Sequence, residues 1–143
     1  MKKGLREQGK EIDAVNKILT NKGYNFKILK GIECDILKDG KLDLADDALA
    51  ELDLVGVAVH SYLNLLAALQ TERMLKAMEN RYINIIFHPT ARIINQRRAM
   101  EFQMDLIIEV AFKSGIALEI NAYPDRLDLK TNILESVWKK ESS

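Results

Sequence analysis

The 143-residue sequence predicts an α/β fold made of parallel βα units, and three observations carry this prediction. The hydrophobic pattern switches along the chain between the spacing of an amphipathic helix and the short apolar runs that are typical of buried strands. The apolar runs lack a polar alternation, as expected for strands that are covered on both faces. The two kinds of segment follow one another in turn, which favours parallel strands joined by right-handed crossovers.

The first half of the chain is predicted to form one long helix and two strands. Apolar residues near helical spacing predict a helix over 5–22, which ends at Gly23. The run FKILKGIECDI is rich in β-branched and aromatic residues and predicts a strand over 26–36, and the KDG that follows is a turn signal. After a short segment around 46–52, the run LVGVAV predicts a second strand over 54–59.

The second half continues the alternation of helices and strands. The predicted elements are a helix over 65–79, a strand over 83–87, a helix over 103–114 that ends at Gly115, a strand over 116–120 and a final helix over 130–139. We find no repeat, linker or low-complexity segment, so we expect a single domain over residues 1–143.

Composition and charge exclude several classes of protein. A content of 48% hydrophobic and 29% charged residues suits one soluble globular domain with a core. The 21 basic and 21 acidic residues cancel, so no overall field attracts DNA or an anionic membrane. The single cysteine, Cys34, excludes an internal disulfide. The N-terminus lacks the apolar core of a signal peptide, and no apolar stretch approaches the roughly 18 residues of a membrane span. We therefore expect a cytoplasmic protein.

Both histidines of the chain stand directly after predicted strands. His60 ends the run VAVH, His88 ends IIFH, and Glu33, Glu119 and Asn121 stand at the equivalent ends of the other strands. Parallel strands present their carboxyl ends at one edge of the sheet, where α/β folds build their sites. Two imidazoles and one carboxylate are ligands that catalytic zinc and other borderline divalent ions use. The sequence therefore predicts a metal site made of Glu33, His60 and His88.

Each candidate also has a structural interpretation. A single histidine at a strand end is more often a hydrogen-bonded structural residue, and Glu33 could cap a helix or form an ion pair. Cys34 alternates to the opposite side of its strand from Glu33, so we interpret it as a packed thiol. The basic loop with Arg92, Arg97 and Arg98 could hold phosphates or be a solvated surface. Any binding of DNA through this loop is expected to be weak and strongly salt-dependent.

Five segments carry a resemblance to a known family. In chain order they are GIECDILKDGKLDL, ELDLVGVAVHS, TERMLKAMEN, FHPTAR and ALEINAYPDRLDL. They resemble the polymerase-and-histidinol-phosphatase (PHP) domain found at the C-terminus of bacterial and archaeal family X DNA polymerases, from about Gly4 to Leu129. The resemblance implies a distorted (βα)7 TIM-like barrel whose rim holds up to three metal ions and hydrolyses phosphoesters. In family X polymerases the implied activity is chiefly that of a 3′-5′ exonuclease.

The resemblance also assigns roles to individual residues. Glu33 matches the family's glutamate that bridges two metals, and His60 and His88 match the next two histidine ligands. The positions that match residues near the substrate or its phosphate are Arg92, Asn121 and Arg126. The implied cofactor is a divalent metal, Zn²⁺ or Mn²⁺, at about one ion per chain.

The chain departs from the family pattern at both ends and at positions inside it. The family's opening His-x-His strand, its following Asp-His motif and its closing Asp-x-His motif have no counterpart, so the chain resembles the central part of a truncated domain. Tyr62 stands where close relatives often have a second histidine, and Phe87 and Ala91 stand where they have glycines. The missing ligands would come from another polypeptide or from a longer gene product that includes a polymerase domain.

Two hypotheses follow about function. In the first, the chain is an incomplete metal-dependent phosphoesterase domain of the polymerase X type. In the second, it is a non-catalytic remnant that binds a metal or assembles with itself, so whether the chain is an enzyme stays open. Four predicted strands cannot close a barrel. Since the unpaired edges of an open sheet need cover, we expect a homo-oligomer.

Overall fold

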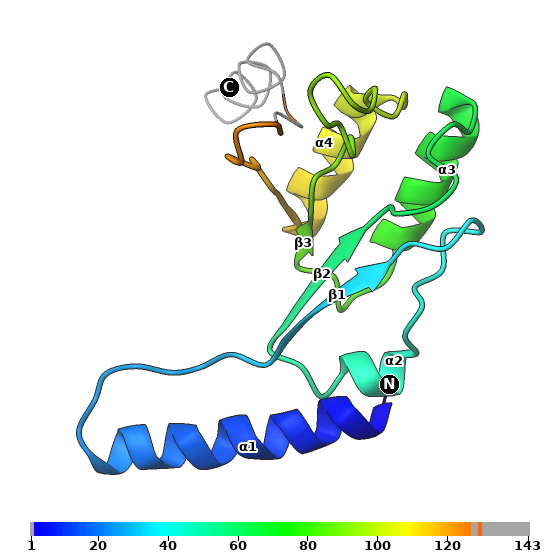
Figure 1. Ribbon diagram of the computed structural model, residues 1–143. Helices are drawn as coiled ribbons and strands as arrows, with labels where there is room; N and C mark the ends of the chain where they lie inside the picture. Colours follow the sequence, from blue (N-terminus) through cyan, green and yellow to red (C-terminus); the bar gives the residue numbers. More distant parts are fainter. Residues whose placement is uncertain (1, 127–128, 130–143) are drawn as a thin grey trace.

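The computed structural model describes residues 2–126 and residue 129, and it confirms an α/β fold with a parallel sheet of four strands (Figure 1). The strand order is β1-β2-β3-β4, and each neighbouring pair is parallel. The elements are α1 (Lys2–Asn21), β1 (Gly31–Asp35), α2 (Asp46–Leu49), β2 (Leu54–Ala58), α3 (Ala67–Met78), β3 (Ile85–Ile86), α4 (Met104–Ser114) and β4 (Ala117–Leu118). The helix predicted over 130–139 lies outside the described residues.

The hydrophobic core lies between one face of the sheet and the helices α3 and α4. Cys34 of β1, Val57 of β2 and Ile86 of β3 belong to one buried cluster with Met74 of α3 and Ile107 of α4, and each of these side chains is at most 1% exposed. Burial raises the pKa of the Cys34 thiol to about 12. The prediction that Cys34 is a packed thiol is therefore confirmed.

The opposite face of the sheet, which we call the open face, has a different composition. Side chains alternate between the two faces of a strand, so Glu33 and Asp35 of β1, Gly56 of β2 and Ala117 of β4 belong to this face. The side chains of Glu33 and Asp35 are 44% and 45% exposed, and α3 and α4 both lie on the other side of the sheet (Figure 1). The prediction of strands that are apolar on both faces is thus wrong for β1, which places Glu33 and Asp35 on the open face. It holds for β2, whose Gly56 and Ala58 are buried there.

The segment between α1 and β1 differs from its prediction. The helix predicted over 5–22 is confirmed as α1, but the strand predicted over 26–36 begins only at Gly31. The side chain of Asn16 takes the place of a neighbouring strand, because its amide donates to the Ile28 carbonyl and accepts from the Ile28 N–H, both at 2.8 Å. The Lys30 N–H donates to Asp53 at 2.9 Å. With its backbone bound by these side chains, the segment runs back along α1 (Figure 1).

Helix α1 and the segment after it leave apolar side chains exposed. The helical pattern predicts an apolar face that includes Val15 and Ile18, yet these side chains are 41% and 53% exposed. The other large apolar side chains that stay exposed here are Tyr24, Phe26 and Leu29. Only the start of the helix reaches the core, where Leu5 packs against the buried cluster.

The remaining elements follow their predictions, with shorter strands. The helices predicted over 65–79 and 103–114 are confirmed as α3 and α4, and Gly115 ends α4 in the left-handed conformation with a φ of 69°. The strands predicted over 83–87 and 116–120 shorten to β3 and β4, and β3 stops where His88 turns the chain with a φ of 31°. None of the helices in the described part of the chain has the length and apolar character required to cross a membrane.

Candidate metal site

The three predicted metal ligands meet at the carboxyl ends of β1, β2 and β3. Glu33 projects from β1 onto the open face, while His60 and His88 each stand two residues beyond the end of their strand. The Oε1 atom of Glu33 lies 3.3 Å from Nε2 of His60 and 3.2 Å from Nε2 of His88. One donor atom from each residue lies within 4.8 Å of the other two. The structure therefore brings together the residues that the sequence proposed as one site.

The spacing of these donor atoms fits a divalent ion. Zinc bonds of 2.0–2.2 Å in a tetrahedral shell hold neighbouring ligand atoms about 3.3 Å apart, which matches the two distances from the Glu33 oxygen. Both imidazoles direct Nε2 at the same carboxylate, and their ring centroids lie 5.2 Å apart. Two neutral imidazoles and one carboxylate suit Zn²⁺ and Mn²⁺. The residues present thus fit the ion that the donor set implies.

The electrostatics of His60 also favour a cation between these groups. Its Nδ1 is hydrogen-bonded to the Oδ1 of Asp35. An ionised carboxylate can only accept, so Nδ1 carries the proton, and in a neutral ring Nε2 then presents a lone pair. That lone pair faces the lone pairs of Glu33 Oε1 at 3.3 Å. Two acceptors at this distance repel each other unless a proton or a metal ion lies between them.

His88 is fixed mainly through its backbone N–H. Its side chain is 12% exposed, and its N–H donates to Oε2 of Glu119 at 2.7 Å. The left-handed φ of 31° is unfavourable for a residue other than glycine, and the bond to Glu119 stabilises it. Glu119, which stands at the predicted rim, therefore positions a candidate ligand. The Nδ1 of His88 is buried and has no hydrogen-bond partner in the described part of the chain.

The three residues proposed to contact substrate have contacts that do not include the candidate metal ligands. Arg92 lines an open cavity of about 370 Å³, whose walls also include Ile93, Asn95, Gln96, Arg97 and Arg98. The side chain of Asn121 accepts a bond from the Tyr123 N–H at 3.0 Å. Arg126 buries its Nη1 without a partner among the described residues. Within residues 2–126, none of these three side chains forms a hydrogen bond or an ion pair with the candidate metal ligands.

Arg73 supports the site, and the sequence pattern did not single it out. This α3 residue is only 3% exposed, and its guanidinium donates to the carbonyls of Leu37 at 2.8 Å and Ser61 at 2.9 Å, and to that of Ile36. Burial lowers the pKa of Arg73, and the nearby carboxylate of Asp35 opposes this change. Arg73 thus ties the end of β1 to the loop that follows His60. One signal is present in the sequence, a cation on the face of the helix that carries Met74 and Ala77.

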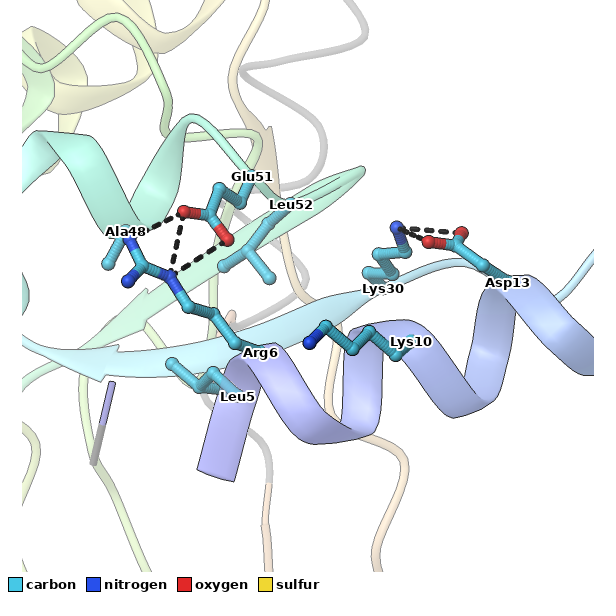
Figure 2. Close-up of a pocket in the computed structure, with 9 residues that line it drawn as sticks. Leu5, Arg6, Lys10, Asp13, Lys30, Ala48, Glu51 and Leu52 are labelled. Atoms are coloured by element: carbon cyan, nitrogen blue, oxygen red, sulfur yellow. Dashed lines mark hydrogen bonds and ion pairs between the residues drawn. The ribbon is translucent and has the colours of Figure 1, made fainter. Parts of the chain in front are cut away.

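A second cavity lies near the start of β1, between α1 and α2, away from the metal ligands (Figure 2). Its volume is about 370 Å³. Ion pairs of Arg6 with Glu51 at 2.9 Å and of Lys30 with Asp13 at 2.7 Å cross its rim. The pair of Arg6 with Glu51 is exposed to solvent, and such a pair contributes little to stability. The cavity is a gap beside a lightly packed helix, and it shares no residue with the metal site.

Comparison with known proteins gives relatives that are longer than this chain. The chain is 47% identical over 130 residues to the DNA polymerase/3′-5′ exonuclease PolX of Bacillus subtilis. The aligned segment covers 91% of this chain and 22% of that protein. It is 34% identical over 97 residues to a probable phosphatase of Shewanella sp. (strain W3-18-1), over 66% of this chain and 36% of that protein. A probable phosphatase of Caldanaerobacter subterraneus is 28% identical over 109 residues, which are 73% of this chain and 41% of that protein. No family model matches the chain.

Proposed function

We propose that the chain is part of a metal-dependent phosphoesterase domain of the PHP type, as in family X DNA polymerases, where such a domain acts as a 3′-5′ exonuclease. One observation carries the proposal: an oxygen of Glu33 and the Nε2 atoms of His60 and His88 converge at the spacing of metal ligands. The similarity to an exonuclease and to probable phosphatases supports it. We further propose that the four parallel strands are part of a distorted (βα)7 barrel.

In this function each residue of the candidate site has a definite task. Glu33, His60 and His88 hold a Zn²⁺ or Mn²⁺ ion, and Glu119 keeps the backbone of His88 in place. When bound, the ion stabilises negative charge on a phosphoryl oxygen and favours ionisation of water. The residues proposed to contact the phosphate are Arg92, Asn121 and Arg126. The buried and unpartnered Nη1 of Arg126 supports this, since a buried donor needs an acceptor.

Metal content tests the proposal directly. The purified 143-residue chain, loaded with Zn²⁺ or Mn²⁺ and dialysed, is expected to retain about one ion, because the described residues contain one group of three suitable ligands. His60→Ala and His88→Ala should each lose it. Glu33→Gln should also lose it, whereas Glu79→Gln, a matched exposed carboxylate beyond α3, should keep it. Metal is counted by inductively coupled plasma mass spectrometry. A metal-free wild type would return both histidines to a structural role.

The same preparation is expected to hydrolyse a simple phosphodiester such as bis(4-nitrophenyl) phosphate very slowly. Two-metal phosphoesterases clamp both the attacking and the leaving oxygen, and one ion supplies only part of that stabilisation. The loss corresponds to several kcal/mol, roughly a thousandfold in rate. Rapid metal-dependent turnover by this chain alone would show that three described ligands suffice for catalysis.

A second candidate function, self-assembly without catalysis, is favoured by the edge of β1. Strand β1 pairs with β2 through its even-numbered residues, so the backbone groups of Gly31 and Glu33 point away from the sheet, and no described residue bonds to them. Such an edge is a template for a further strand. We therefore propose that the chain forms at least a dimer. Sedimentation equilibrium at micromolar concentration should give more than one chain per particle, and a single monomeric species would contradict this.

A further inference from the structure

We propose that Asp35 is a positioning residue that fixes the imidazole of His60 for metal binding, an inference that rests on the proposed metal site. Asp35 and Glu33 stand two residues apart on β1 and so project from the same face. Asp35 bonds Nδ1 of His60, while Glu33 faces Nε2 of the same ring at 3.3 Å. The two carboxylates thus contact opposite nitrogens of one imidazole. A carboxylate on the second nitrogen of a ligating histidine fixes its tautomer and orientation.

The two histidines differ in how much they need such support. The side chain of His60 is 48% exposed, so packing does little to restrict its rotamer. The side chain of His88 is 12% exposed, and Glu119 fixes its backbone N–H. The Nδ1 of His88 has no partner in the described part of the chain. Asp35 therefore bonds to the ring of His60, which packing does not hold. His88 is held by packing and by the bond from its backbone to Glu119.

Asp35 is itself firmly placed at the end of β1. Its N–H donates to Oδ1 of Asp43 at 3.0 Å, and the Asp43 N–H donates back to the Asp35 carbonyl at 3.0 Å. The hairpin that brings Asp43 to this position is closed by the Leu37 N–H, which donates to the Lys41 carbonyl at 2.7 Å. Arg73 binds the carbonyls that follow Asp35. A carboxylate anchored in this way defines one direction for the ring that bonds to it.

The geometry points to positioning rather than direct ligation. The Oδ1 of Asp35 is already engaged by the ring nitrogen that does not face Glu33. The group of donor atoms that could share an ion consists of Glu33, His60 and His88, without Asp35. Substitution of Asp35 should therefore disturb the ring of His60 first and metal affinity only as a consequence.

Two substitutions of Asp35 separate these roles, because asparagine keeps a side-chain hydrogen-bond acceptor and alanine removes it. The side-chain oxygen of Asp35→Asn can still accept a bond from the Nδ1–H of His60, whereas Asp35→Ala leaves the ring free. In metal-free protein at about pH 9, well above the range in which an imidazole ordinarily takes up a proton, ¹H–¹⁵N correlation NMR reports the tautomer. We expect His60 to be in the Nδ1–H form in the wild type and in Asp35→Asn, and to shift toward the Nε2–H form in Asp35→Ala. The signals of His88 should change little and serve as the internal control.

Metal titration by calorimetry then gives the consequence for binding. The Kd is expected to rise about 10- to 100-fold in Asp35→Ala and less than about threefold in Asp35→Asn. An unchanged His60 tautomer in Asp35→Ala would overturn the positioning role. Equal losses of affinity in Asp35→Asn and Asp35→Ala would instead identify Asp35 as a ligand, since both remove the charge. The NMR result does not depend on metal, so a wild type that binds no ion but shows the expected tautomers would contradict the proposed function and leave the orientation of His60 by Asp35 established.

Discussion

Gly56→Ala is expected to lower the free energy of unfolding by about 1–3 kcal/mol. The ring of Phe87 covers Gly56 so closely that a Cβ on residue 56 would lie 1.9 Å from Cε2 of that ring and 2.6 Å from Cζ. The backbone conformation of Gly56 is an ordinary one, so the constraint is space alone. To accept the methyl group, the Phe87 ring has to turn away or the backbone of β2 or of the segment that carries His88 has to move. Urea denaturation followed by circular dichroism measures the change.

A double-mutant cycle tests the cause of this loss. In the background of Phe87→Leu the smaller side chain leaves room at position 56, so adding Gly56→Ala should cost much less than it does in the wild type. The difference, a coupling energy, is expected within the range of about 0.5–3 kcal/mol found for residues in contact. If Gly56→Ala costs the same in both backgrounds, contact with Phe87 is not the reason for the glycine.

Arg73→Met is expected to destabilise the protein by about 2–4 kcal/mol, because an unsatisfied buried acceptor costs about 1–3 kcal/mol. The substitution keeps an unbranched side chain of comparable reach but removes every donor. The carbonyls of Ile36 and Ser61 lose the guanidinium as their partner, while that of Leu37 still accepts from the Gly40 N–H at 2.9 Å. Against a typical total of 5–15 kcal/mol for a folded domain, this is a large fraction.

The matched control is Glu72→Met, on an exposed position of the same helix. It should change the midpoint of urea denaturation little, since surface substitutions usually stay within about 0.5 kcal/mol. Arg73→Lys should fall between the two, because an ammonium group can reach only part of the set of carbonyls. An Arg73→Met protein as stable as Glu72→Met would mean that water satisfies these carbonyls when the guanidinium is gone.

The sequence predicted those parts of the fold in which periodic burial decides the structure. Residues of α3 and α4 such as Met74 and Ile107 repeat at helical spacing because one side of each helix packs on the sheet. The ends of the strands were equally accessible to prediction, since a buried apolar run that stops at a histidine marks a carboxyl end. Glu33, His60 and His88 could be grouped for this reason, and the structure places their donor atoms together.

The features that escaped prediction depend on single contacts without a period. The segment before Gly31 has the composition of a strand, but β propensity requires a neighbour, and Asn16 binds the backbone of Ile28 in its place. The bonds of Asp35 to His60 and of Arg73 to the carbonyls join residues more than 10 positions apart. Only the folded arrangement of β1, β2 and α3 reveals such partners.

The division between the two faces of the sheet bears on how this protein can change during evolution. The side chains that hold the helices are buried on one face, whereas Glu33 and His60 are nearly half exposed at the edge of the other. Substitutions at exposed positions generally cost little stability. Mutation can therefore remove or replace Glu33 and His60, two of the three candidate ligands, one at a time while the fold persists under selection. A lineage of such chains can exchange one chemistry for another, or retain none, without passing through an unfolded ancestor.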